Sequence, residues 1–235
     1  MFGRLLPGSG RWSGGIAPEY RFWKRWFKTR GLHWPEEFRQ RLDPQTSFSD
    51  YLRRFIPETQ EIVRILDVGA GPLTDVGYHW ENRKLLITAV DPLAELYQKL
   101  YRKFQIDPPV RTVPGRAEEL SLIFGENCFD LVQARNALDH AENPLQGLKE
   151  MVRCVRPGGW VILNHNLNEG AGEHYRGFHQ WDFFLRHGRF FIRGRRGIEW
   201  DVANELDGVE IETNPELGDW VQVHIRKLPL AGERE

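Results

Sequence analysis

The residues best placed to do chemistry are two acids, each of which closes an apolar run. Asp67 stands in the run Ile-Leu-Asp-Val-Gly-Ala-Gly that ends at Gly71, and Asp91 follows Gly71 by twenty residues at the end of Ile-Thr-Ala-Val-Asp. A strand that enters a glycine turn, followed by a strand that ends on a carboxylate, is typical of sheets that hold an adenosine nucleoside. We therefore expect a nucleoside site at these two strand ends.

The sequence of the glycine turn restricts the class of nucleoside ligand that can bind. Its window, Gly69-Ala70-Gly71-Pro72-Leu73-Thr74, lacks the third glycine that dinucleotide sites use for close helix packing. Asp67 would repel a pyrophosphate but could pair with an ammonium group, so an amino-acid head is favoured over a dinucleotide. The alternative is that Asp67 and Asp91 are simple helix caps, which their joint spacing disfavours.

The elements that position these acids form a βα alternation. Apolar strands separated by helices predict a parallel sheet covered on both faces, and a strand-and-turn pattern after residue 188 predicts an antiparallel finish. The expected strands are 63–68, 85–90, 110–113, 129–133, 160–164, 189–193, 198–202, 209–213 and 220–226, and the expected helices between them are 73–80, 93–104, 118–124 and 144–155. The fold class is therefore α/β, with a Rossmann-like, doubly wound sheet.

The N-terminal region differs from the rest in composition. Residues 1–18 are predicted to be a flexible tail, 19–60 a helical lid and 61–230 the sheet domain. The net charge is −1, but residues 1–34 carry +6 and the remainder −7. This basic segment either meets an anionic partner or lies on the acidic body of its own domain.

The bulk composition sets the class of protein. The chain has 235 residues, 40% of them hydrophobic and 28% charged, which is ordinary for one globular domain with an extension. The sequence shows no apolar run long enough to span a membrane. Cys128 and Cys154 have no metal or redox spacing, which favours reduced thiols and a cytoplasmic location.

These motifs resemble those of the class I S-adenosylmethionine-dependent methyltransferases. The resemblance covers about residues 63–164 and includes the glycine turn, Val90-Asp91 and Phe129-Asp130-Leu131-Val132. Its most specific part is the run 148–163, a helix that ends at Arg-Pro-Gly-Gly and leads into a strand. The family implies S-adenosyl-L-methionine as the cofactor and a cytoplasmic transferase.

The resemblance also implies which residues bind the cofactor. Asp67 and the turn would hold the methionine part, Asp91 both ribose hydroxyls, and Ala117 with Glu118 the adenine, while residues after the fourth strand would line the cavity near the sulfonium. The expected cofactor-binding residues are Asp67, Gly69, Ala70, Gly71, Asp91, Pro92, Ala117, Glu118, Gln133, Ala134 and Arg135.

Methyl transfer to a hydroxyl needs a proton acceptor, and histidine is suited to that role. His165 is our first candidate because it follows the fifth strand, and His179 and His140 come next. Asp139, His140, His165 and Glu169 could supply metal ligands, but their spacing matches no recognised pattern. The sequence therefore predicts no metal.

Three functions remain open. The main hypothesis is O-methylation of a small polar molecule or a sugar or glycan hydroxyl, because polar and aromatic residues fill 173–183. The second is a nucleic-acid methyltransferase, chiefly of RNA, that grips a strand with the basic segment. It is disfavoured by the acidic body and by the lack of a base-methylating motif at 134–137. The third is a non-catalytic cofactor-binding subunit whose N-terminal helix contacts an anionic membrane. The sequence leaves the oligomeric state open.

Overall fold

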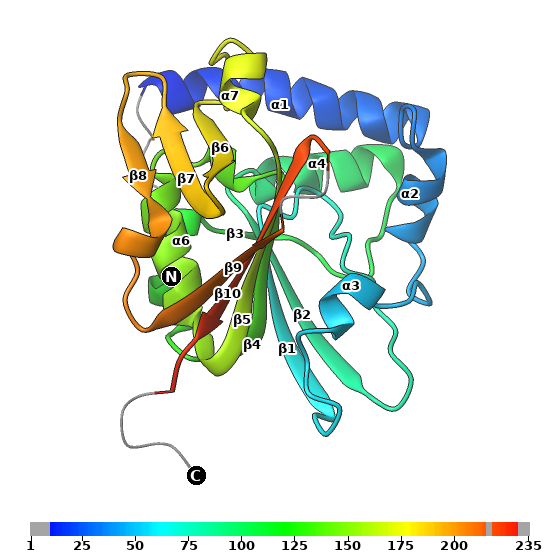
Figure 1. Ribbon diagram of the computed structural model, residues 1–235. Coiled ribbons are helices and arrows are strands. Elements are labelled where there is room, and N and C mark those ends of the chain that lie inside the picture. The colour runs from blue at the N-terminus through cyan, green and yellow to red at the C-terminus, as the bar shows by residue number, and fades with distance from the viewer. Residues whose placement is uncertain (1–9, 215–217, 230–235) are drawn as a thin grey trace.

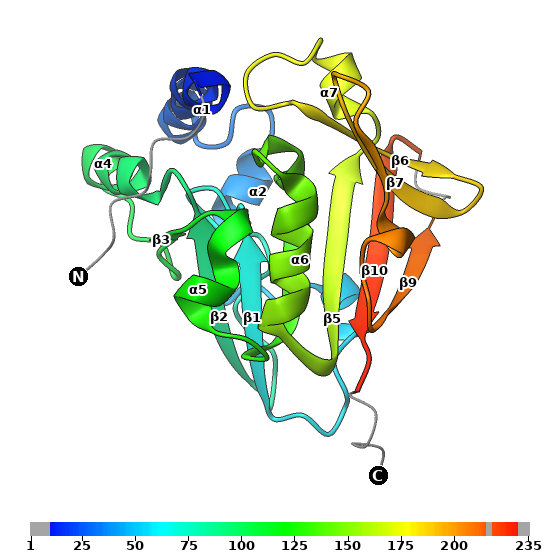
Figure 2. The ribbon, with the colours of Figure 1, turned by 90° about the vertical axis from the view of Figure 1, so that its left-hand side faces the viewer.

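The computed structural model describes residues 10–214 and 218–229. A seven-stranded sheet forms its centre. The helices of residues 10–29 and 94–104, labelled α1 and α4, lie beside each other near one end of that sheet (Figures 1 and 2). The strands of this sheet are β1 (Ile62–Val68), β2 (Lys84–Asp91), β3 (Val113–Pro114), β4 (Phe129–Arg135), β5 (Val155–Asn166), β9 (Val209–Asn214) and β10 (Trp220–Lys227).

The strand order confirms the predicted fold class. The order is β3-β2-β1-β4-β5-β10-β9; the first five strands pair in parallel, and β10 is antiparallel to both β5 and β9. The carboxyl ends of β1, β2, β4 and β5 therefore meet at one edge of the sheet, where ligands of open α/β sheets bind. A separate antiparallel sheet consists of β6 (Trp181–Arg186), β7 (Arg189–Gly194) and β8 (Glu199–Asp201).

Alternating residues of the strands build a core on each face of the sheet. Leu66 and Val68 point toward α5 (Leu120–Phe124) and α6 (Pro144–Cys154), with Leu148 and Met151 in the same cluster. Val63 and Ile65 belong to the cluster on the other face, which contains α3 (Asp50–Arg53). Successive side chains point to opposite faces, and both faces are covered, so the carboxyl end of β1 and most of β4 are buried almost continuously, as a doubly wound sheet requires.

The N-terminal helices form a third cluster. Helix α1 (Gly10–Thr29) lies beside α4 (Ala94–Phe104), and α2 (Pro35–Gln40) follows (Figure 2). Trp26 and Phe27 are buried here against Phe38 and Tyr101. The aromatic face of α1 is thus the face that packs. The helix begins at Gly10, nine residues before the expected start of the helical lid at residue 19, and Gly15 lies tightly against Phe178. Residues 1–9 of the predicted tail lie outside the described residues.

One other prediction of local structure was wrong. The expected helix at 73–80 is a series of turns, because Thr74 donates its hydroxyl to Asp67 and Ser47 bridges to His79. Tertiary partners override the local propensity of this segment. The polar and aromatic segment 173–183 is irregular up to β6, which begins at Trp181, and its residues Glu173, Phe178 and His179 lie at the cavity described below.

Gly77 fixes the shape of the irregular segment between β1 and β2. Its φ is +79°, and a Cβ there would lie 2.0 Å from the backbone oxygen of Ser47. We expect Gly77→Ala to destabilise the protein by about 3 kcal/mol, since left-handed strain and a backbone clash act together. A thermal melt should show the midpoint about 6–12 °C lower. Gly172→Ala, where a Cβ would meet nothing within 4 Å, is the control, and equal midpoints for the two variants would contradict the expectation.

Candidate functional site

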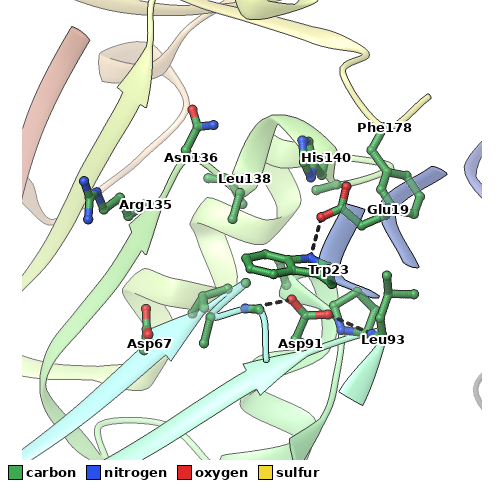
Figure 3. Close-up of a pocket in the computed structure, with 18 of the residues that line it drawn as sticks. Glu19, Trp23, Asp67, Asp91, Leu93, Arg135, Asn136, Leu138, His140 and Phe178 are labelled. Atoms are coloured by element: carbon green, nitrogen blue, oxygen red, sulfur yellow. Dashed lines mark hydrogen bonds between the residues drawn. The ribbon is translucent and has the colours of Figure 1, made fainter. Parts of the chain in front are cut away.

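A cavity of about 740 Å³ lies at the carboxyl ends of the parallel strands, beneath α1 (Figure 3). Its floor is the glycine turn after β1 and the end of β2, and α1 contributes Glu19, Phe22 and Trp23 to its wall. Residues that follow β4 and residues near α7 (Glu169–Gly172) complete the opposite side. Its size and mixed lining suit a ligand of nucleoside size or larger.

Asp91 is fixed in the floor of this cavity by backbone donors. Its Oδ2 accepts a hydrogen bond from the Gly71 N–H at 3.1 Å, and its Oδ1 accepts one from the Leu93 N–H at 2.8 Å (Figure 3). Burial raises the pKa of Asp91 to about 6, against these hydrogen bonds, which lower it, and with a smaller contribution from the charge of Glu19. Each oxygen keeps a lone pair for a ligand donor, so the carboxylate can still receive a vicinal diol.

The glycine turn brings the backbone directly against its neighbours. Gly71 has a φ of +62°, and a Cβ at this residue would lie 2.8 Å from Cζ2 of Trp23. The indole of Trp23 therefore packs on the turn, and its Nε1 donates to Glu19 at 2.7 Å. A glycine is needed here both for the backbone angle and for the approach of this ring.

Asp67 lies deeper than Asp91 and belongs to a buried charged network. It accepts hydrogen bonds from Thr74 Oγ1 and, at 2.9 Å, from Gln133 Nε2. Burial and the nearby Asp75 carboxylate raise the pKa of Asp67 to about 7. The pKa of Asp75 is instead lowered, because the charges of Arg41 and Arg135 outweigh its burial.

The structure brings most of the predicted cofactor residues to this cavity. Those that line it are Asp67, Gly69, Ala70, Gly71, Asp91, Pro92, Ala117, Glu118 and Arg135, together with His140 and His179. Gln133 and Ala134 are buried within β4 and do not line it, so Gln133 acts on the site through its hydrogen bonds to Asp67 and Asp75. Glu118 accepts a hydrogen bond from the Asn143 N–H at 3.0 Å, which fixes its carboxylate.

A histidine and carboxylate cluster lies at the other side of the cavity. The 3-10 helix η2 (Leu138–His140) presents Asp139 and His140, and the segment before β6 presents His179. His179 Nδ1 lies 3.1 Å from both His140 Nε2 and Asp139 Oδ2, and 3.6 Å from Glu169 Oε1. Figure 3 shows His140 beside Phe178, away from Asp67.

The histidines and carboxylates of this cluster stabilise one another's charged forms. Burial lowers the pKa of His179, but the hydrogen bond and charge of Asp139 and the charge of Glu169 outweigh it and raise the pKa above its ordinary value. Asp139 is buried, yet its pKa is lowered because His140, His165 and His179 stabilise its carboxylate. The cluster can therefore receive a proton or a cation.

His165, our first candidate for a proton acceptor, does not line the cavity. It is 1% exposed and packs edge-on against Phe183, with ring centroids 4.8 Å apart. Its Nδ1 lies 3.8 Å from Asp139 Oδ1, beyond hydrogen-bond distance. His165 lies within β5, and its side chain points into the core beside Phe183, so a position near a strand end did not by itself predict which residues reach the cavity.

Several cavity residues had no individual role in the sequence interpretation. They are Glu19, Phe22, Glu37, Arg41, Asp75, Leu138 and Trp220. A helical lid was expected at 19–60, but only the fold shows that part of α1 covers the glycine turn. Trp220 could not have been predicted, since β10 reaches the site by inserting beside β5.

An α/β sheet with a glycine turn and a buried acid, Asp91, in a cavity at its carboxyl edge is typical of nucleoside-binding Rossmann-like domains. Residues 66–163 match the family described as a methyltransferase domain. A solved structure from Methanococcus maripaludis, provisionally described as an S-adenosyl-L-methionine-dependent methyltransferase, covers 98% of this chain and is itself fully covered, with a TM-score of 0.56 at 16% identity. That similarity supports the fold.

Curated relatives agree with the family match. The tRNA U34 carboxymethyltransferase of Trichlorobacter lovleyi is 32% identical over 128 residues, which cover 51% of this chain and 38% of the relative. The enzyme of the same name from Pseudoalteromonas atlantica is 30% identical over 180 residues, which cover 68% of this chain and 50% of the relative. The matched region thus spans half or less of these relatives' own length.

The chain carries a class I S-adenosylmethionine-dependent methyltransferase domain, and this family implies S-adenosyl-L-methionine as the cofactor. Among the described residues, no helix is both long and apolar enough to cross a membrane.

Proposed function

We propose that the protein is an S-adenosylmethionine-dependent methyltransferase that uses the cavity beneath α1. The observation that carries this proposal is the carboxylate of Asp91, which two backbone N–H groups hold in the cavity floor beside the glycine turn. The donor set fits the cofactor: an ionised Asp91 can accept both ribose hydroxyls, and Asp67 is an acid near the place expected for the ammonium group. When bound, the cofactor supplies an electrophilic methyl group on a sulfonium.

The chain's own residues would divide the remaining work. Asp91 and the glycine turn bind and orient the nucleoside and amino-acid parts, and Trp23 with α1 excludes water from that side. The cluster of Asp139, His140 and His179 marks the acceptor side, where a nucleophile must lose its proton as it attacks.

Cofactor affinity should depend on pH through the buried carboxyls. The pKa of Asp91 is about 6 and that of Asp67 about 7, both raised, so each group takes up a proton as the pH falls through these values. A ribose diol and an ammonium group both favour the ionised form, so we expect affinity to be highest above pH 7. It should fall by up to about tenfold per pH unit between pH 7 and 6, where one carboxyl is protonated, and by up to about a hundredfold per unit below pH 6, where both are. Calorimetric titration of S-adenosylmethionine from pH 5 to 8 measures this. A constant dissociation constant across that range would contradict it.

For the acceptor, the relatives favour the nucleic-acid alternative over our small-molecule hypothesis, and we propose RNA, with tRNA as the first candidate. Beyond the relatives' names, support comes from an exposed basic face, which we define as Arg21, Lys24, Arg25 and Lys28 of α1 and Arg30 directly after it. None of these side chains forms an ion pair with a described residue, so the basic face does not lie on an acidic surface of its own domain. Free cations of this kind attract a phosphate backbone.

Aromatic residues at the cavity mouth add to this support. Phe22 and Trp34 both line the cavity and are 42% and 53% exposed. Exposed rings beside a basic surface are suited to stacking on an unpaired base. An RNA strand that follows α1 could therefore place one nucleoside at the mouth.

The test is a transfer assay with methyl-labelled cofactor and three acceptor pools: bulk tRNA, ribosomal RNA and a mixture of sugars and lipid-linked glycans. We expect label in tRNA, and mass spectrometry of the nucleosides identifies the group added, since the relatives are named for carboxymethyl transfer. Lys24→Glu with Lys28→Glu should weaken RNA binding more than the control Lys99→Glu on α4. Label confined to the sugar pool would overturn the RNA proposal and leave the methyltransferase proposal intact.

A small polar acceptor is the second candidate, and the cavity wall favours it. Acidic side chains outnumber arginines there: Glu19, Glu37, Asp67, Asp75, Asp91, Glu118, Glu169 and Glu173 face Arg41, Arg116 and Arg135. An acidic lining repels phosphate, whereas it can hydrogen-bond to the hydroxyl groups of a sugar.

A further inference from the structure

Hydrogen bonds alone do not explain the geometry of the histidine and carboxylate cluster at the acceptor side of the cavity. Three atoms converge there: His140 Nε2, His179 Nδ1 and Asp139 Oδ2, with separations of 3.1, 3.1 and 3.5 Å. If His179 Nδ1 carries a proton, that proton can point at His140 or at Asp139 but not well at both. If both nitrogens carry protons toward Asp139, two N–H groups face each other at 3.1 Å.

The same triangle matches the ligand spacing of a metal ion. Nitrogen and oxygen ligands lie about 2.0–2.1 Å from Zn²⁺, which places the ligand atoms of a tetrahedral site about 3.3–3.4 Å apart. Glu169 Oε1 lies 3.6 Å from His179 Nδ1 and could complete the set. The three atoms from Asp139, His140 and His179 all lie within 4.8 Å of one another.

Unpartnered polar atoms surround the triangle. Asp139 is 2% exposed, and its Oδ1 has no hydrogen-bond partner among the described residues. Glu169 Oε2 is also buried without a partner in the described part of the chain. Polar atoms left in this state are costly unless something absent from the protein chain satisfies them, and a cation would serve both carboxylates.

We propose that Asp139, His140 and His179, with Glu169 as a further ligand, bind one divalent transition-metal ion on the wall of the cavity. Two imidazoles and one or two carboxylates suit Zn²⁺, Fe²⁺ or Mn²⁺ better than Mg²⁺ or Ca²⁺, which prefer oxygen ligands. His140, His179 and Glu169 line the cavity, so the bound ion would face the acceptor side. His165, 3.8 Å from Asp139 Oδ1, would lie behind the ligands as a neighbour that positions Asp139.

The sequence predicted no metal because its ligands lack regular spacing. Asp139 and His140 are adjacent, but Glu169 and His179 come from a segment that returns to η2 through packing of Phe178 on His140. A ligand set divided between two segments in this way leaves no motif to recognise.

The proposal is tested by calorimetric titration of the full-length, metal-free protein with Zn²⁺ in the absence of cofactor. We expect one Zn²⁺ per chain, with affinity at least tenfold lower in His140→Ala and in His179→Ala and unchanged in His79→Ala, an exposed histidine outside the cluster. Mg²⁺ in the same titration should bind far more weakly. No saturable Zn²⁺ binding by the wild type, or wild-type affinity in both cluster variants, would overturn the proposal.

A second measurement needs no variant and decides the case if a variant folds poorly. Zn²⁺ should protect His140 and His179 of the wild type from acylation by diethyl pyrocarbonate, as read by peptide mass spectrometry, while His79 stays reactive. Equal modification of the cluster with and without Zn²⁺ would reject the site. Neither readout involves methyl transfer. The proposed function and the metal site can therefore be rejected independently of each other.

Discussion

Asp91→Ala should abolish measurable binding of S-adenosylmethionine. The wild-type carboxylate would accept two ribose hydroxyl hydrogen bonds, and bonds to a charged acceptor contribute about 1.5–3 kcal/mol each. Their loss corresponds to a dissociation constant roughly 10²–10⁴ times higher. The effect is increased because the N–H groups of Gly71 and Leu93 also lose their acceptor, which loosens the floor of the cavity. Calorimetric titration of the cofactor measures it.

The matched control for this variant is Glu95→Ala. Glu95 is an exposed carboxylate in the first turn of α4, four residues further along the chain, and it does not line the cavity. Its loss should leave the cofactor's dissociation constant unchanged. Wild-type affinity in Asp91→Ala would remove the observation on which the proposed function depends, whatever the acceptor is.

His179→Ala should have the second large effect, on turnover and not on cofactor binding. His179 is joined to His140 and Asp139 on the acceptor side and is not part of the floor that holds the nucleoside. Loss of a group that takes up a proton, or that holds a cation for the same purpose, lowers kcat by about 10²–10⁴-fold. The cofactor's dissociation constant should stay within about threefold, as expected of an interaction made in the transition state.

Two further histidine variants make this expectation specific. His79→Ala should retain wild-type turnover, since His79 is exposed outside the cavity. His165→Ala should reduce turnover less than His179→Ala does, because His165 reaches the cluster only through Asp139. Full turnover in His179→Ala with none in His165→Ala would contradict this expectation. It would favour His165, the first candidate from the sequence, as the proton acceptor.

The sheet and the cofactor end of the site could be predicted from the sequence because their signals are local. Asp67, the glycine turn and Asp91 lie in two neighbouring parallel strands and the turn after the first, so their spacing in the sequence indicates their arrangement in space. The acceptor end could not be predicted in the same way. Whether His165 or His179 reaches the cavity depends on how β5 is paired and on where the chain runs before β6, and both are long-range properties.

The same difference between local and long-range signals explains why part of the cavity wall was not predicted from the sequence. The helix at 73–80 was expected from the βα alternation, but Thr74 bonds to Asp67, and Gly77 turns the chain against Ser47. Asp75 therefore comes to lie in the cavity with Arg41 and Arg135, a contact that no periodicity indicates.

The packing of Trp23 on Gly71 gives the protein a built-in optical signal. Indole emission depends on the polarity and hydrogen bonding around the ring, and this indole lies on the glycine turn with its N–H bonded to Glu19. A ligand that settles on the turn should change those surroundings. The chain has nine tryptophans, so the part of the emission change that is lost in Trp23→Phe should follow occupancy of the nucleoside site without a label.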